Sequence, residues 1–208
     1  MTRHIPNLLT ASRFFMAIGF FIVLGFYNPR IAGQPGWPVL DVAFFVFLVA
    51  VCTDMVDGYL ARKLGHVTTF GRIADPFVDK IIVCGALVYC VGDPFLRAAP
   101  DGTLENLTGW RPWMVAVIIA RELLVTGMRS FSESHSIPFA ASLSGKVKMF
   151  VQCTAICWSI FFVAHWADGP DWTRLVRDAL IWATTLFTAF SGLVYVQRAY
   201  QLLKLPPD

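Results

Sequence analysis

Residues Asp54 to Asp79 of the chain read DMVDGYLARKLGHVTTFGRIADPFVD. This stretch carries four aspartates, and the segments on either side of it, 39–53 and 80–96, are largely apolar. A single aspartate at the centre of a membrane-spanning helix costs about 2.5–3.5 kcal/mol. Four of them between two apolar segments therefore indicate a functional polar site at the edge of a bilayer.

The composition of the whole chain agrees with a membrane protein. Of its 208 residues, 56% are hydrophobic and 15% are charged, whereas a soluble domain usually carries about 25% charged residues. A membrane-spanning helix needs about 20 mainly apolar residues, and the segments that meet this requirement are 12–28, 39–64, 73–96, 112–132, 146–166 and 176–203. We predict one all-α integral membrane domain over residues 1–208, with six transmembrane helices and a short N-terminal interfacial segment from Pro6 to Ala11.

The basic residues predict the orientation, because Lys and Arg are enriched at cytoplasmic helix ends. With the N-terminus inside, most of them fall at cytoplasmic ends. We therefore expect both termini and the acidic site to face the cytoplasm, in a cell membrane of the bacterial type. The net charge of +3, without a basic stretch interleaved with aromatic residues, argues against nucleic-acid binding. Five cysteines without a CxxC pair argue against a disulfide framework or a zinc site.

Helical spacing places the acidic residues on two faces that can meet. The residues of the second segment that share one helix face, at i, i+3, i+4, i+7 and i+8, are Asp54, Asp57, Gly58, Ala61 and Arg62. In the third segment, Asp75 and Asp79 are four residues apart and again share a face. A short cytoplasmic connection makes the two helices antiparallel, so we expect the two acidic faces to begin at the same level.

Four carboxylates this close repel one another unless cations neutralise them. Two divalent cations would balance four negative charges, and ligation by oxygen alone favours Mg²⁺ or Mn²⁺ over zinc. A pair of such ions suits displacement at phosphorus, because it holds phosphate oxygens and stabilises the leaving group. The small side chains of Gly58 and Ala61 leave room for a ligand. The structural alternative is that the acids only form ion pairs with Arg62, Lys63, Arg72 and Lys80.

The run Asp54-x2-Asp57-Gly58-x2-Ala61-Arg62-x8-Gly71-x3-Asp75-x3-Asp79 resembles the complete signature of the CDP-alcohol phosphatidyltransferases. The resemblance implies a homodimer of six-helix subunits with a polar cavity open to the cytoplasm. It implies that Asp54, Asp57 and Asp75 hold two divalent cations, and that Asp79 is the general base on or near one of them. It further implies that the CDP group lies against Asp57, Gly58, Ala61, Arg62 and Gly71.

Three further stretches resemble the branch of this family that uses glycerol 3-phosphate as its acceptor. They are Ile5–Thr10 with Arg13, Ala120–Arg129, and Gly145–Lys148 with Gln152. The residues that we expect to bind the acceptor phosphate are Arg121, Arg129, Lys146 and Lys148. Arg129, Lys146 and Lys148 can instead be plain cytoplasmic basic residues. Glu122 can orient an arginine or cap a partner helix, and we assign it no catalytic role.

The reaction expected from this resemblance is phosphatidyl transfer from CDP-diacylglycerol to glycerol 3-phosphate, giving phosphatidylglycerol phosphate and CMP. A related transferase that uses inositol phosphate or phosphatidylglycerol would keep the same signature. A cation transporter could also be built around an acidic cluster, but it would need polar residues across the whole bundle, and the outer halves of the segments are apolar. A non-catalytic scaffold gives no reason for the spacing of Gly58, Ala61 and Gly71.

Overall fold

The fold is seen in a computed structural model that describes residues 5–27, 37–64, 69–98, 102–134 and 143–203. Within these ranges, the side chains that lie outside the description belong to residues 5–10, 37, 54–64, 69–79, 133–134, 143–144, 146 and 198–203.

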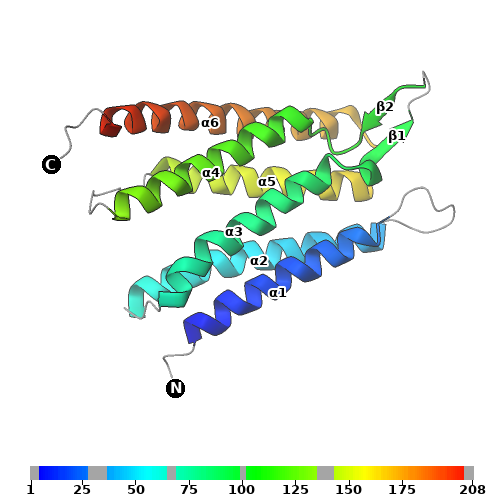
Figure 1. The fold of residues 1–208 in the computed structure, drawn as a ribbon. Helices are drawn as coiled ribbons and strands as arrows, with labels where there is room; N and C mark the ends of the chain where they lie inside the picture. Colours follow the sequence, from blue (N-terminus) through cyan, green and yellow to red (C-terminus); the bar gives the residue numbers. More distant parts are fainter. Residues whose placement is uncertain (1–4, 28–36, 65–68, 99–101, 135–142, 204–208) are drawn as a thin grey trace.

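The described chain forms a bundle of long helices that alternate in direction (Figure 1). In order, the helices are α1 (Ile5–Gly25), α2 (Trp37–Leu64), α3 (Thr69–Cys90), α4 (Pro112–Ser134), α5 (Leu143–His165) and α6 (Asp171–Leu203). A 3₁₀ turn, η2 (Asp93–Phe95), and an antiparallel hairpin of β1 (Leu96–Ala98) and β2 (Leu104–Asn106) separate α3 from α4. We call the end with this hairpin the hairpin end, and the opposite end, where α2, α4 and α6 finish, the charged end.

The helical class is confirmed, and some boundaries differ from the prediction in an informative way. Residues 6–11, expected as a separate interfacial segment, are the first turns of α1, because neither Gly nor Pro interrupts the chain between them and the apolar run. The third segment was expected to run to residue 96, but α3 ends at Cys90. Gly92 and Pro94 break the helix there, and the chain turns into η2 and β1.

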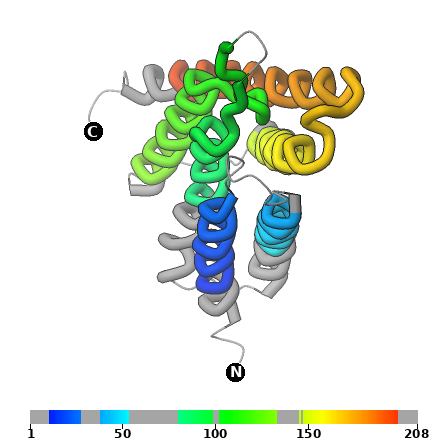
Figure 2. The backbone as a smooth tube through the Cα atoms, turned by 90° about the vertical axis from the view of Figure 1, so that its right-hand side faces the viewer, coloured from blue at the N-terminus to red at the C-terminus, as the bar shows by residue number. Residues whose placement is uncertain are grey.

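Large apolar side chains fill the space between the helices. Phe20 of α1 contacts Phe47 of α2, with ring centroids 5.4 Å apart, and both side chains are fully buried. Gly85 lets α3 approach α1 closely, because a Cβ atom there would overlap the ring of Phe21. Small residues commonly permit such close approach between membrane helices. Figure 2 shows α1 and α2 on one side of the bundle and α6 across the other, with α3, α4 and α5 between them.

Two described helical stretches are long and apolar enough to cross a membrane: Val147–His165 in α5 and Asp171–Gln197 in α6. The apolar parts of three other helices are shorter within the described residues: Ala11–Gly25, Pro38–Thr53 and Lys80–Cys90. Large apolar side chains also face outward. Phe15 on α1 and Phe190 on α6 are each 69% exposed, and such outward-facing apolar surface is typical of a protein that contacts lipid.

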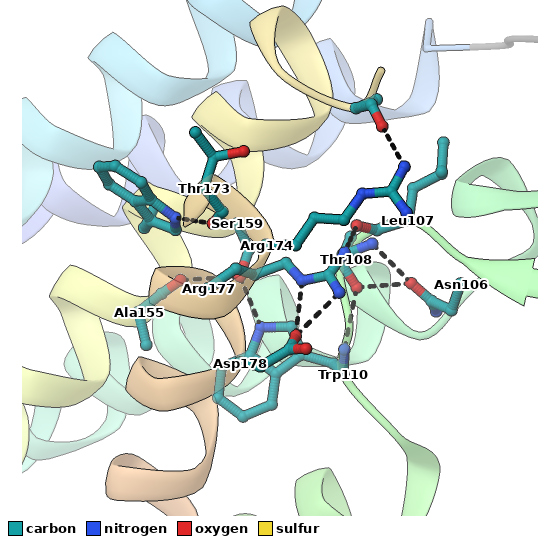
Figure 3. A network of polar contacts seen from close by, with 12 residues as sticks. Asn106, Leu107, Thr108, Trp110, Ala155, Ser159, Thr173, Arg174, Arg177 and Asp178 are labelled. Atoms are coloured by element: carbon teal, nitrogen blue, oxygen red, sulfur yellow. Dashed lines mark hydrogen bonds and ion pairs between the residues drawn. The ribbon is translucent and has the colours of Figure 1, made fainter. Parts of the chain in front are cut away.

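Polar contacts fasten the connections at the hairpin end (Figure 3). Arg177 of α6 is buried, donates from Nη1 to the carbonyl oxygen of Leu107 at 2.8 Å, and pairs with Asp178. Its guanidinium carbon lies 4.7 Å from the ring centroid of Phe162 on α5. Gly109 has a φ of +80°, and a Cβ atom there would lie 2.7 Å from Arg177 Nε, so both backbone and space require glycine.

Candidate active site

The stretch that carries the signature lies on two successive helices at the charged end. Asp54 and Asp57 belong to the last turns of α2, which ends at Leu64, and Asp75 and Asp79 belong to the first part of α3, which begins at Thr69. The predicted helical placement of both acidic pairs is therefore confirmed. The side chains of residues 54–79 lie outside the described part of the structure, so the meeting of the two acidic faces stays a prediction.

A cluster of charged side chains lies next to this region, between α3, α4 and α5. Glu122 of α4 forms an ion pair through Oε1 with Nζ of Lys148 on α5. The same oxygen lies 3.3 Å from Nη1 of Arg121. The side chains of Lys148, Arg121 and Glu122 are only 5%, 8% and 15% exposed. One carboxylate thus holds two largely buried cations from different helices.

The backbone of Glu122 also connects this cluster to α3. Its carbonyl oxygen accepts a hydrogen bond from Thr126 Oγ1 at 2.7 Å, and Lys80 Nζ donates to the same oxygen at 3.4 Å. Lys80 directly follows Asp79 in the sequence. The cluster and the second acidic stretch are therefore carried by adjoining parts of the bundle.

The charges in this cluster do not balance among its described side chains. Lys80, Arg121 and Lys148 contribute three positive charges, whereas Glu122 contributes one negative charge. Burying a charge without a partner is costly, and buried ions are normally paired. Two excess positive charges in a half-buried to buried setting are what a site for a doubly charged anion requires.

Two buried polar atoms of the described chain without a hydrogen-bond partner, on α5 and α6, also favour a polar ligand. Within the described residues, Nε2 of Gln152 and Oγ1 of Thr188 are buried and have no hydrogen-bond partner. Gln152 is one helical turn beyond Lys148 on α5. Buried donors are nearly always satisfied by protein, water or ligand. Each of these two groups can therefore take a polar ligand or an ordered water as its partner.

Arg121 is held on its other side by α6. Its Nε donates to Ser191 Oγ at 3.0 Å, and its guanidinium carbon lies 5.2 Å from the ring centroid of Tyr195. Helices α4 and α6 pack together along this region. The charged cluster and its contacts therefore draw on four helices, α3 to α6.

Comparison with known proteins gives the family. The model of the family described as CDP-alcohol phosphatidyltransferase matches residues 3–190. The chain belongs to the CDP-alcohol phosphatidyltransferase family. It is 32% identical over 205 residues to a Bacillus subtilis protein named CDP-diacylglycerol--glycerol-3-phosphate 3-phosphatidyltransferase, with 97% of each chain covered. Proteins of the same name from Rickettsia typhi (31% identical; 93% of this chain and 95% of the relative covered) and Salmonella paratyphi A (30% identical; 96% of each covered) are also similar.

Of the four residues predicted to bind the acceptor phosphate, the structure places two in the charged cluster. Arg121 and Lys148 come together around Glu122, in the buried cluster between α3, α4 and α5. Arg129 lies two turns further along α4, and its side chain is exposed. Lys146 belongs to α5, but its side chain lies outside the described residues. The cluster is therefore built around Arg121, Glu122 and Lys148, with Arg129 nearer the surface.

Four residues of the cluster were not predicted to bind the acceptor. Glu122 was expected to orient an arginine or cap a helix, and its contact with Arg121 agrees with the first of these, while Lys80 was named only as a possible ion-pair partner of the aspartates. Ser191 and Tyr195 fall in the last third of the chain, which carries no motif. The available signal was the spacing of the last two, four residues apart on α6 and hence on one face.

No group of three or more metal-ligating side chains occurs among the residues whose side chains are described. The four predicted metal ligands are all in the stretch 54–79, outside that description. As a donor set, four aspartates on two helices offer only hard oxygen ligands. Such ligands suit Mg²⁺ and Mn²⁺ and disfavour soft metals.

Proposed function

We propose that this protein transfers the phosphatidyl group of CDP-diacylglycerol to glycerol 3-phosphate, giving phosphatidylglycerol phosphate and CMP. The observation that carries the choice of acceptor is the buried cluster of Arg121, Lys148 and Lys80 around the single carboxylate of Glu122. A phosphate monoester carries a charge of about −1.5 to −2 at pH 7, which matches the excess positive charge. The names of the relatives, which specify glycerol 3-phosphate, support the same acceptor.

The nucleotide and the metal ions belong to the signature stretch. Asp54, Asp57, Asp75 and Asp79 would hold two divalent cations, Mg²⁺ or Mn²⁺, which neutralise the diphosphate and stabilise the departing phosphate. The CDP group would lie against Asp57 and the remaining signature positions, which are Gly58, Ala61, Arg62 and Gly71. The small residues leave room for the nucleotide, and the guanidinium of Arg62 pairs with a phosphate oxygen.

The transfer itself is a direct displacement at phosphorus. Asp79 takes the proton from the primary hydroxyl of glycerol 3-phosphate, and the resulting oxygen attacks the β-phosphorus of CDP-diacylglycerol. The new phosphorus–oxygen bond forms as the bond to the CMP oxygen breaks, and CMP leaves. Arg121 and Lys148 hold the acceptor phosphate, so that its far hydroxyl is directed toward α3, which carries Asp79. Arg129 and Lys146 would attract the acceptor from the cytoplasmic side.

The alternative acceptors differ in how well their charge matches the excess positive charge of the cluster. A neutral alcohol such as choline or free inositol carries no phosphate and would leave the excess positive charge unbalanced. Phosphatidylglycerol offers only a phosphodiester, with a single negative charge. Inositol phosphate carries a monoester like that of glycerol 3-phosphate, so it is the acceptor that the experiment must exclude.

The proposed setting is a cell membrane, with six transmembrane helices, both termini and the active site on the cytoplasmic side, and two subunits in the dimer. The outward-facing apolar side chains of α1 and α6 support contact with lipid. The charged end, where the signature stretch lies, is the end predicted to be cytoplasmic from its basic residues. Access of a water-soluble phosphate ester from the cytoplasm is consistent with that orientation.

The test is an assay of the detergent-purified full chain with labelled CDP-diacylglycerol. We expect CMP release that depends on glycerol 3-phosphate and on Mg²⁺ or Mn²⁺, with phosphatidylglycerol phosphate as the lipid product. Inositol phosphate, phosphatidylglycerol and free inositol serve as the comparison acceptors. A higher kcat/KM with any of these than with glycerol 3-phosphate would overturn the proposed acceptor.

A further inference from the structure

We infer that α6 positions the acceptor by holding Arg121 between Ser191, Gly192 and Tyr195. We call these three residues the α6 seat. The inference rests on the proposed function, because it assigns the seat to the affinity for the phosphorylated acceptor. It concerns the last third of the chain, which carries no part of the family signature.

Ser191 fixes the direction of the Arg121 side chain. Its hydroxyl donates to the carbonyl oxygen of Thr188 at 3.0 Å, so its single proton is committed to the helix backbone. The oxygen lone pairs are then available as acceptors, and Arg121 Nε donates to this oxygen at 3.0 Å. Both side chains are buried. The hydrogen bond therefore has a defined direction, and it holds the inner edge of the guanidinium against α6.

Tyr195 supports the flat face of the same guanidinium. The guanidinium carbon lies 5.2 Å from the ring centroid, within the roughly 6 Å over which a cation is attracted to an aromatic face. Tyr195 is four residues beyond Ser191, so the two side chains lie on one face of α6. The tyrosine is buried, which strengthens the attraction because water competes less for the cation.

Gly192 lets α6 come close enough for both contacts. A Cβ atom at this position would lie 3.3 Å from Arg121 Cγ and 3.8 Å from Arg121 Cβ. The first distance is shorter than an ordinary van der Waals contact between carbon atoms. A side chain here would crowd the stem of Arg121, which would have to shift by a few tenths of an ångström relative to Ser191 and Tyr195. The seat thus combines a hydrogen-bond acceptor, an aromatic face and a missing side chain.

While Ser191 and Tyr195 hold Arg121 against α6, its Nη1 group contacts the charged cluster. An arginine has five N–H groups in a rigid fork. The contact with Ser191 uses the N–H on Nε, and the contact with Glu122 involves Nη1. These two contacts leave three N–H groups of the fork, one on Nη1 and two on Nη2, and the carboxylate that Nη1 contacts also pairs with Lys148. An arginine immobilised in this way loses less side-chain entropy when it binds a phosphate.

A purely structural role for the seat predicts a different outcome from a positioning role. If the seat only packs α6 against α4, its loss lowers stability and affects both substrates alike. If it positions Arg121, its loss raises KM for glycerol 3-phosphate selectively, because CDP-diacylglycerol binds at the signature stretch on α2 and α3. The ratio of the two KM values therefore separates these roles.

The test compares Tyr195→Leu, Tyr195→Phe and Ser191→Ala in the full-length protein. We expect Tyr195→Leu to raise KM for glycerol 3-phosphate about 3- to 30-fold, as befits the loss of a buried cation–π contact, with KM for CDP-diacylglycerol within about twofold of wild type. Tyr195→Phe keeps the aromatic face and is expected to stay near wild type. Ser191→Ala is expected to raise the acceptor KM about 5-fold or more, as befits the loss of a hydrogen bond to a charged group.

The matched control is Phe162→Leu, which removes the cation–π contact with Arg177 at the hairpin end. It is expected to lower the melting temperature without changing either KM. Equal effects of Tyr195→Leu on both KM values, or equal acceptor KM values for Tyr195→Leu and Tyr195→Phe, would overturn the inference.

A binding measurement keeps this test separate from the test of the reaction. Glycerol 3-phosphate, but not glycerol at the same concentration, is expected to raise the melting temperature of the wild-type protein, and Tyr195→Leu is expected to reduce that shift by more than half. If glycerol 3-phosphate binds in this way but supports no CMP release, the proposed reaction fails while the seat stands. If the shift is equal in wild type and Tyr195→Leu, the seat fails.

Discussion

Replacing Glu122 by glutamine isolates the charge of the one carboxylate in the cluster. The amide keeps the size of the side chain but removes the negative charge that pairs with Lys148 and Arg121. Breaking a buried ion pair by removing one partner costs about 3–5 kcal/mol. Because Glu122 is 15% exposed, we take the lower value, about 3 kcal/mol. For a chain of this length, that loss lowers the melting temperature by about 6–12 °C.

The same substitution should increase the response to the acceptor. With Glu122 replaced, three cations lack an anionic partner among the described side chains of the cluster, so a bound phosphate relieves more repulsion than in the wild type. Thermal unfolding of the detergent-purified protein, with and without saturating glycerol 3-phosphate, measures both effects. We expect the ligand-induced rise in melting temperature to be larger in Glu122→Gln than in the wild type.

Asp178→Asn is the control for this experiment, since it alters the ion pair with Arg177 at the hairpin end, where Asp178 is half exposed. We expect a small change in its melting temperature and an unchanged response to glycerol 3-phosphate. The reasoning about charge balance is refuted if Glu122→Gln unfolds at the wild-type temperature, or if glycerol 3-phosphate stabilises it less than the wild type.

Three further outcomes are expected. Asp79→Asn should abolish CMP release while largely sparing CDP-diacylglycerol binding, and near-normal turnover would sink the assignment of Asp79 as the base. Chelation of divalent cations should abolish turnover, and added Mg²⁺ or Mn²⁺ should restore it; activity that survives chelation would contradict the metal role of the four aspartates. The Arg97 guanidinium donates to both carboxylate oxygens of Asp168 and lowers the pKa of Asp168. A lowered pKa means that this contribution to stability is present above the unfolded-state pKa, about 3.9, and is lost as the pH falls through the folded-state pKa. Asp168→Asn should therefore flatten the acid side of the stability profile slightly, and an unchanged profile would show that the exposed pair contributes nothing.

The helices were predictable because long apolar segments and their breakers dominate this sequence. Pro112 marks the start of α4 in both the prediction and the structure. The hairpin between α3 and α4 was not predictable, because its strands have three residues each and alternation over so short a run carries no signal. The start of α1 was misplaced because the mixed polar and apolar stretch from Pro6 to Ala11 was interpreted as a separate segment, whereas the helix continues through it.

The charged cluster was predictable in part. Arg121 stands out because a basic residue within an apolar helix usually has a function, whereas Lys148 was singled out through the family resemblance. The pairing of Lys148 with Glu122 depends on how α4 and α5 are rotated against each other, and a single sequence does not contain that rotation. Ser191 and Tyr195 were missed because both residue types also occur in membrane helices as interhelical contacts and interfacial anchors.

The two neighbouring tryptophans Trp113 and Trp182 show how the Arg121 contacts keep their register. Their ring centroids are 5.8 Å apart, and α4 and α6 run in the same direction from this contact (Figure 1). Both helices rise about 1.5 Å per residue. From this contact, Arg121 and Ser191 therefore lie at matching heights about two turns further on, where they form their hydrogen bond. One residue inserted into α6 between Trp182 and Ser191 would turn Ser191 by about 100° around the helix axis, so that its hydroxyl would no longer face Arg121. A change of length in the connection between α4, which ends at Ser134, and α5, which begins at Leu143, leaves both spacings unchanged.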